Sequence, residues 1–243
     1  MSRNSTQHVC SDGSAKLAAV MLFCITIPAV SAAIRGPLIA APMITVRVID
    51  KAGVPGPTLR DAAAAAQRIF REAGVETQWL LCAPLQESEG QDVECPPAMV
   101  SGELRVVMVP RSMEKKFRKD FPVSASAFGT TLVGADGHRT PFVYVLYGRI
   151  EAKLSTAPCP DAVPRDAVLL GHVLAHEIGH VLLGSAHTRL GLMSANWDQR
   201  GYTKMACGEL GFGDDEAQRL KAEAGSRNRQ KQADTDGGLI AAR

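Results

Sequence analysis

The feature that most constrains the fold is the sequence His176-Glu177-Ile178-Gly179-His180, which lies within an apolar-rich run. Residues 165–183 are predicted to form one long helix that ends at Gly184. Four helical residues turn by about 400°, so the two histidines share one face and lie about 6 Å apart along the axis. Two imidazoles in this arrangement can bind a single Zn²⁺. The sequence therefore predicts a helix that packs into the core and carries a metal site.

Glu177 follows His176 directly and is rotated from it by about 100° around the helix. It cannot easily be a third ligand on the histidine face, but it can reach a water that the metal holds. Zinc lowers the pKa of such a water to about 7. These residue types at this spacing therefore predict hydrolytic chemistry, in which the carboxylate takes the proton of the bound water.

The residues after the helix extend this pattern. His187 follows the Gly184 turn, and Met193 ends a Gly-Leu-Met sequence. Here the sequence resembles the metzincin clan of zinc metallopeptidases, which share the pattern His-Glu-x-x-His-x-x-Gly-x-x-His followed by a methionine turn. The resemblance implies that three histidines ligate the zinc, namely His176, His180 and His187.

The same resemblance assigns roles to the neighbouring residues. Glu177 would be the general base, and Met193 would pack beneath the metal. Gly184 would end the helix and turn the chain back. A peptide substrate would lie extended along the strand near residues 127–133.

The spacing departs from that of the clan by one residue. Position 183 is leucine, so the glycine and the third histidine both come one residue late. An additional helical residue rotates the exit of the chain by about 100°, so the turn must differ. If His187 is not the third ligand, we expect a later carboxylate to replace it, as in the gluzincin peptidases, either Glu209 or Glu216.

The rest of the chain mixes strands and helices without a regular alternation, which predicts an α+β fold. Apolar positions between residues 59 and 73 predict a helix that backs the sheet, and residues 214–224 a final polar helix. By resemblance, we expect one metzincin-like domain with a small twisted mixed sheet. Strands are predicted at residues 43–49, 75–81, 104–109 and 142–147, with a weaker one at 126–133.

Four segments divide the chain. Residues 1–32 combine a basic flank, an apolar core and small residues, which is typical of a secretory signal peptide. A linker at 33–42 and the zinc metallopeptidase domain at 43–225 follow. Residues 226–243 have almost no core-forming side chains and are expected to be a disordered tail. The signal peptide predicts a secreted or periplasmic location.

Four of the six cysteines lie outside the predicted signal peptide. An even number of cysteines in an exported chain favours disulfides. Three pairings are open. We expect Cys82 to pair with Cys95, which closes a short polar loop, and Cys159 to pair with Cys207, which braces the flanks of the histidine segment.

Three further features carry weaker expectations. His172 lies one turn before His176 and is expected to be a surface histidine. Tyr202 is a candidate to stabilise the oxyanion of the reaction. The basic run at residues 111–119 is expected to be a solvated helix face.

Composition and charge exclude several classes of function. A net charge of +2 and an aromatic content of 5% disfavour a nucleic-acid binder. No apolar run reaches the ~18–20 residues of a membrane-spanning helix, so no stable membrane insertion is expected. We therefore expect a secreted peptidase with one catalytic Zn²⁺ that hydrolyses a peptide or protein through Glu177. The alternatives are a secreted zinc-binding interaction domain without turnover and a metal-dependent hydrolase of a non-peptide amide. The sequence does not predict the oligomeric state.

Overall fold

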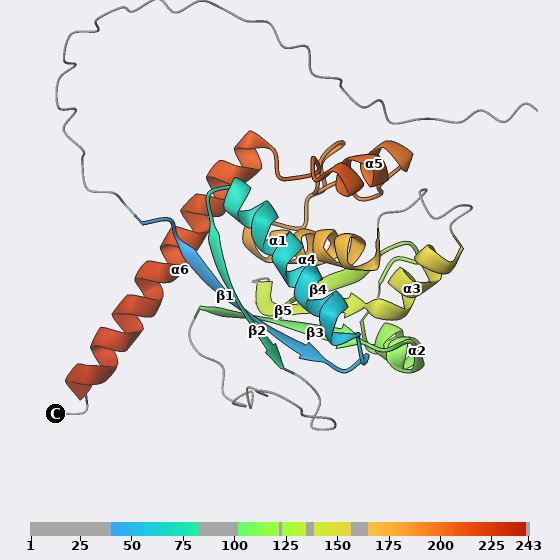
Figure 1. Cartoon of the computed structure of the whole chain (residues 1–243). Coiled ribbons are helices and arrows are strands. Elements are labelled where there is room, and N and C mark those ends of the chain that lie inside the picture. The colour runs from blue at the N-terminus through green and yellow to red at the C-terminus, as the bar shows by residue number, and fades with distance from the viewer. Residues whose placement is uncertain (1–39, 83–101, 122, 135–138, 157–164, 242–243) are drawn as a thin grey trace, which may run out of the picture. The chain divides into compact units, whose positions relative to one another are not determined.

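The computed structural model describes residues 40–82, 102–121, 123–134, 139–156 and 165–241. These residues form an α+β fold with a five-stranded mixed sheet and six helices (Figure 1), so the expected fold class is confirmed. The expected signal peptide and most of the expected linker lie outside the described residues and stay predictions.

The sheet has the strand order β2-β1-β3-β5-β4. Its first four strands run parallel, and β4 pairs antiparallel with β5 at one edge. Four strands match the predicted ones to within three residues, whereas the weaker strand is shorter than expected and begins at Gly129. The bounds are β1 Met43–Asp50, β2 Glu76–Cys82, β3 Glu103–Val109, β4 Gly129–Val133 and β5 Arg139–Leu146.

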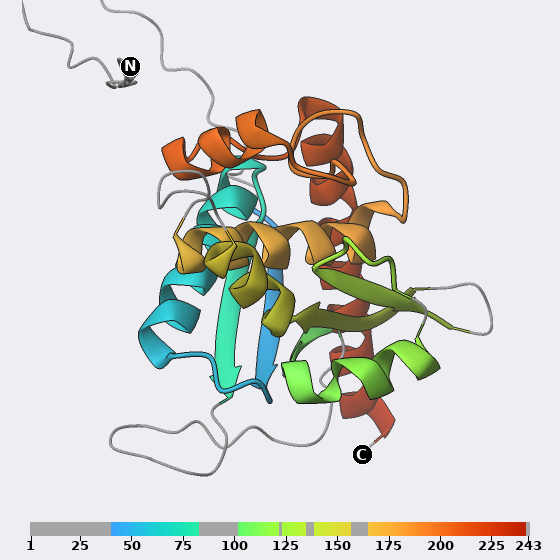
Figure 2. The ribbon, with the colours of Figure 1, turned by 90° about the vertical axis from the view of Figure 1, so that its right-hand side faces the viewer.

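The core lies between one face of the sheet and two helices. Helices α1 (Gly56–Glu72) and α4 (Asp166–Leu183) lie side by side over this face (Figures 1 and 2). The strands fill the space beneath them with fully buried apolar side chains, among them Val46, Val106 and Val143. Burying one large apolar side chain stabilises a fold by about 1.5–3 kcal/mol. The position of α4 is therefore set by the core.

Helix α4 is buried over most of its length, and every residue from 169 to 182 is inaccessible or nearly so. Among the described residues it is the one helix long and apolar enough to cross a membrane. However, 78% of this helix is buried inside the fold, as is typical of a core helix. It ends at Gly184 as expected.

Two short helices were not predicted. Helix α3 (Tyr147–Ser155) begins at the last residue of the expected strand, and α5 (Gln199–Cys207) follows the histidine segment. The side chain of Asp198 caps α5 by accepting a hydrogen bond from the Gly201 N–H at 2.9 Å. Helix α2 (Arg111–Asp120) buries none of its residues, which confirms the expected solvated basic helix.

The expected disordered tail is wrong for most of its length. Helix α6 continues from Asp214 to Ala241 and passes beside the start of β1 (Figure 1), so the folded region extends well beyond residue 225. The Asn228 amide donates to the Met43 carbonyl oxygen at 2.6 Å and accepts from the Met43 N–H at 2.9 Å. An ion pair between Arg227 and Glu223 supports the same segment. Disorder was expected from the sequence because residues 226–243 lack an apolar stripe. Ion pairing along the helix and the docking of Asn228 hold this part of α6 instead.

One expected disulfide is also wrong. Cys207 is an exposed free thiol at the end of α5, so it does not pair with Cys159. Cys82 is disulfide-bonded. Its expected partner, Cys95, lies outside the described residues, and that pairing stays a prediction.

The close approach of α1 and α4 gives a test of the fold. A Cβ at Gly171 would lie 2.7 Å from the Ala65 Cβ and 2.8 Å from the Ala62 carbonyl oxygen. We expect Gly171→Ala to lower the free energy of unfolding by about 1–3 kcal/mol in urea denaturation, because the helices must separate.

The matched control is Gly225→Ala in α6. The nearest atom to a Cβ there is the end of the flexible Arg229 side chain, at 3.5 Å. Alanine should therefore raise stability by up to about 1 kcal/mol through its helix propensity. An equal effect of the two substitutions would contradict the tight packing of α1 against α4.

Candidate metal centre

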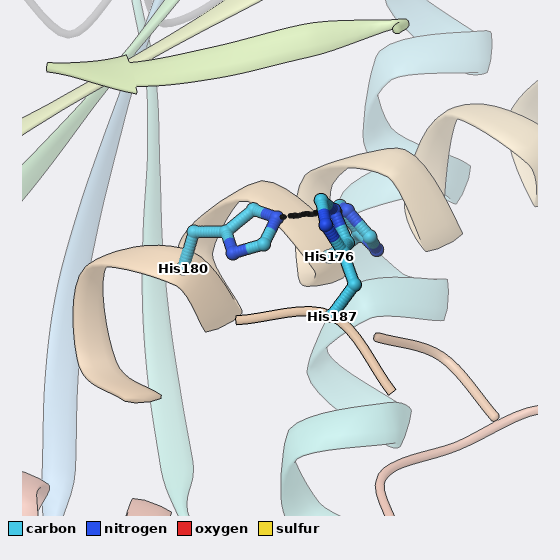
Figure 3. A group of neighbouring side chains, drawn as sticks. All are labelled: His176, His180 and His187. Atoms are coloured by element: carbon cyan, nitrogen blue, oxygen red, sulfur yellow. Dashed lines mark hydrogen bonds between the residues drawn. The ribbon is translucent and has the colours of Figure 1, made fainter. Parts of the chain in front are cut away.

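Three histidine side chains meet at the C-terminal half of α4 (Figure 3). His176 and His180 project from the helix, and His187 comes from the segment that follows it. The Nε2 of His180 lies 3.0 Å from the Nε2 of His176 and 3.2 Å from the Nε2 of His187. One ligand atom of each lies within 4.8 Å of the others, so the three histidines can hold one metal ion.

Backbone contacts determine which ring nitrogens carry protons. The Nδ1 of His176 lies 2.8 Å from the Leu192 carbonyl oxygen, and the Nδ1 of His180 lies 2.8 Å from that of Gly184. A carbonyl oxygen only accepts, so each Nδ1 donates and carries the proton. In the neutral rings both Nε2 atoms are then unprotonated and carry a lone pair. The two Nε2 atoms face each other at 3.0 Å. This arrangement fits a shared cation and does not fit a pair of neutral rings that hydrogen-bond to each other.

Burial keeps these two imidazoles neutral. His176 and His180 are at most 8% exposed. Burial lowers the pKa of His176 to about 4 against the smaller opposing effect of its hydrogen bond to Leu192, and burial also lowers the pKa of His180. Neutral imidazole is the form that ligates a metal. His187 is exposed.

The chain that leaves α4 orients both buried rings. Gly184 has a φ of 124°, which residues with a side chain rarely adopt, and its carbonyl receives the His180 Nδ1–H. The chain then folds back, and the Thr188 N–H donates to the Met193 carbonyl oxygen at 2.9 Å. This turn presents the Leu192 carbonyl to His176. The helix end and the turn therefore each fix one imidazole, as outer partners of metal ligands commonly do.

Met193 and Trp197 support this arrangement. Met193 is buried against α4, because a Cβ at Gly179 would lie 2.6 Å from its Sδ. The Trp197 Nε1 donates to the Leu192 carbonyl oxygen at 3.2 Å, and its ring meets that of His176 edge to face, with 5.3 Å between centroids. Trp197 was missed by the sequence analysis. Its position four residues after the methionine was the available signal.

Glu177 lies beside the histidines and is 5% exposed. Burial raises the pKa of its carboxyl group to about 8, and no stabilising partner counters this effect among the described residues. Strand β4 passes directly over it: a Cβ at Gly129 would lie 2.8 Å from the Glu177 Cδ and 2.6 Å from the Tyr144 carbonyl oxygen. Gly129, also missed by the sequence analysis, thus allows the strand to approach the carboxylate.

A cleft of about 970 Å³ gives access to the site. It is lined by all three histidines and Glu177, by β4 and the segment before it, by the cleft-facing residues of α2 and α3, and by residues 194–197 with Tyr202. The three histidines, the Glu177 carboxylate and the sheet edge therefore face one common space that a substrate can enter.

Three residues from the sequence analysis lie outside the cluster. Glu209 is exposed after α5, and Glu216 accepts the Gly213 N–H at 2.8 Å at the start of α6. Neither carboxylate belongs to the metal-binding group, which consists of histidines. His172, expected at the surface, is fully buried, and its Nδ1 donates to the Val168 carbonyl oxygen at 2.7 Å.

No model of a known protein family matches the chain, and a search of curated proteins gives no match. The histidine cluster, the adjacent carboxylate and the cleft are therefore the features that indicate a function.

The cluster predicts one metal ion per chain. Zn²⁺ added to metal-free protein should bind with a stoichiometry of one and raise the midpoint of thermal unfolding, because an ion that binds the folded state stabilises it. His187→Ala should lower the affinity and the thermal shift, as measured by calorimetry and elemental analysis.

His172→Asn is the matched control, because His172 lies on the same helix but outside the cluster. Folded His172→Asn protein should keep one Zn²⁺ per chain. Unchanged occupancy in His187→Ala would remove that residue from the ligand set.

Proposed function

We propose that this chain is a zinc-dependent peptidase of the metzincin type. The observation that carries the proposal is the convergence of three imidazole Nε2 atoms beside the Glu177 carboxylate in one open cleft. The expected signal peptide at residues 1–32 would place this activity outside the cytoplasm.

The donor set supports zinc as the ion. Imidazole nitrogen is a preferred ligand of Zn²⁺, and catalytic zinc sites use three protein ligands and keep a further position open. His176, His180 and His187 would hold the ion. When bound, zinc supplies a Lewis acid that polarises a carbonyl group and makes water acidic. Within the described residues three protein ligands meet at the site, rather than the four of a structural site, and this favours catalysis over a purely structural role.

Glu177 is the residue placed to move protons. It follows a ligand histidine on α4 and lines the cleft, and no ion pair or hydrogen bond holds its carboxylate among the described residues. A cation held by the histidines would oppose the raised pKa of this carboxyl group and favour its ionised form. The ionised carboxylate can accept a proton from the water that attacks the scissile carbonyl and deliver that proton to the leaving amine. Gly129 and the β4 backbone keep the carboxylate at the cleft wall.

The sheet edge favours a polypeptide as the substrate. Within the described residues β4 pairs on one side alone, with β5, and residues 128–131 line the cleft. An extended peptide can add to an unpaired strand edge through main-chain hydrogen bonds. This edge distinguishes the proposal from the alternative of a small non-peptide amide, which could not use it.

The decisive variant is Glu177→Gln, which keeps the shape of the side chain and removes its basicity. Zinc-loaded Glu177→Gln protein should keep one ion per chain and lose at least about 100-fold in the rate of casein or peptide hydrolysis, the usual range for a general base. Wild-type hydrolysis should stop with a chelator and return with Zn²⁺.

Glu209→Gln is the matched control, because Glu209 is exposed and outside the cleft lining. It should hydrolyse the same substrates at the wild-type rate. Hydrolysis that persists in Glu177→Gln would remove the assigned base. A wild-type protein that binds zinc but cleaves no peptide would favour the interaction domain instead.

A further inference from the structure

The cleft wall formed by α2 and α3 carries an excess of positive charge. Arg149 is engaged: its Nε donates to the Glu114 Oε1 at 2.7 Å, and its Nη1 donates to two backbone carbonyls. Arg118 and Lys153 line the same cleft. In the part of the chain that the structure describes, no ion pair joins either of them to a carboxylate. The wall therefore presents cationic groups without matching anions.

Lys153 is held by an aromatic ring rather than by an acid. Its side chain is half-buried, and its Nζ lies 4.8 Å from the centroid of the Tyr202 ring. Such contacts contribute about 0.5–2 kcal/mol, enough to favour one position of the ammonium group. The ring leaves the charge uncompensated, so the ammonium can still donate hydrogen bonds to an anion. Tyr202 is itself buried and lines the cleft, which makes the pair a preformed part of the wall.

Consecutive residues connect this pair to the histidine cluster. Trp197 meets His176 edge to face, and Asp198, the next residue, caps α5. Tyr202 lies in α5, and a Cβ at Gly201 would lie 3.1 Å from the Trp197 Cβ, so the start of α5 packs against the tryptophan. The Lys153–Tyr202 pair therefore has a fixed position relative to the metal ligands.

We propose that Lys153, seated on the Tyr202 ring, binds a carboxylate of the substrate, so that the enzyme prefers polypeptides with an acidic side chain close to the cleaved bond. This proposal rests on the proposed peptidase function. The interaction is one charged hydrogen bond at a half-buried site that is separate from the proton-transferring carboxylate. It therefore sets substrate choice and leaves the chemical step to Glu177.

The test uses zinc-loaded full-length protein and peptides with amidated C-termini that differ by Glu, Gln or Lys at each position within four residues of the cleaved bond. At one position we expect kcat/KM for the Glu peptide to exceed that for the Gln peptide by about tenfold, the scale of one charged hydrogen bond. Lys153→Met should reduce this ratio to about one and change the Gln peptide less than about twofold. Lys153→Glu should make the Lys peptide the better substrate.

Two controls identify the source of the preference. Lys204→Met removes an equal charge from an exposed position of α5 outside the cleft lining and should keep the ratio. Tyr202→Phe keeps the ring and should keep the ratio, whatever the overall rate, whereas Tyr202→Leu should lower it. Equal losses in Lys153→Met and Lys204→Met would indicate a general field of charge and overturn the subsite.

A peptide with a free C-terminus and no acidic side chain tests the other source of a carboxylate. If Lys153→Met abolishes a preference for the free acid over the amide, Lys153 binds a carboxylate that is terminal. Absence of any Glu over Gln or acid over amide preference in the wild-type protein would overturn the proposal.

A binding measurement separates this proposal from the peptidase function. Fluorescence anisotropy with labelled peptides and zinc-loaded Glu177→Gln protein requires no turnover. The Glu peptide should bind about tenfold more tightly than the Gln peptide, and adding Lys153→Met should remove the difference. If no peptide is cleaved by the wild-type protein but this difference is present, the peptidase function fails while the carboxylate site stands. Cleavage by the wild-type protein without a difference in affinity between the Glu and Gln peptides would contradict the carboxylate site and leave the peptidase function standing.

Discussion

Two imidazole Nε2 lone pairs face each other across 3.0 Å, an arrangement that a cation between them would stabilise, and the candidate site is built around this approach. The Leu192 and Gly184 carbonyls accept hydrogen bonds from the two Nδ1–H groups, so both Nε2 atoms keep a lone pair that can bind a cation. Burial makes the alternative, a protonated ring, unfavourable. His187 brings a third nitrogen to the same place. The protonation state and the convergence of the three rings thus support a metal site.

The fold contributes rigidity where this arrangement needs it. Helix α4 is packed into the core along almost its whole length, and Gly171 lets it approach α1 closely enough to fix its position. At the other end, Gly184 reverses the chain, and Met193 packs against Gly179. His176 and His180 therefore project from a helix packed into the core, and His187 precedes Thr188, whose N–H is hydrogen-bonded to the Met193 carbonyl oxygen. The cleft walls formed by α2 and α3 carry the charges that we propose select a substrate.

The sequence predicted what depends on local pattern. The helix of residues 165–183, its glycine end, the pairing of His176 with His180 and four of the five strands follow from periodicity, spacing and turn residues within short windows, whereas the place of His187 in the cluster was expected from the resemblance to the metzincin clan. Features that depend on distant contacts were missed. Gly129 is needed because a side chain there would collide with Tyr144 and Glu177, which lie far from it in the sequence. Helix α6 continues past residue 225, where Asn228 is hydrogen-bonded to Met43 at the other end of the described chain. The exposed Cys207 shows likewise that an even count of cysteines does not determine pairing.

The central claim is that His176, His180 and His187 converge on one ion. X-ray absorption spectroscopy of the chain loaded with one Zn²⁺ tests it most directly. We expect three imidazole nitrogens at about 2.0–2.1 Å and one light, non-protein ligand in the wild-type protein, and one imidazole fewer in His187→Ala. A sulfur ligand at about 2.3 Å, or two imidazoles in the wild-type protein, would contradict it.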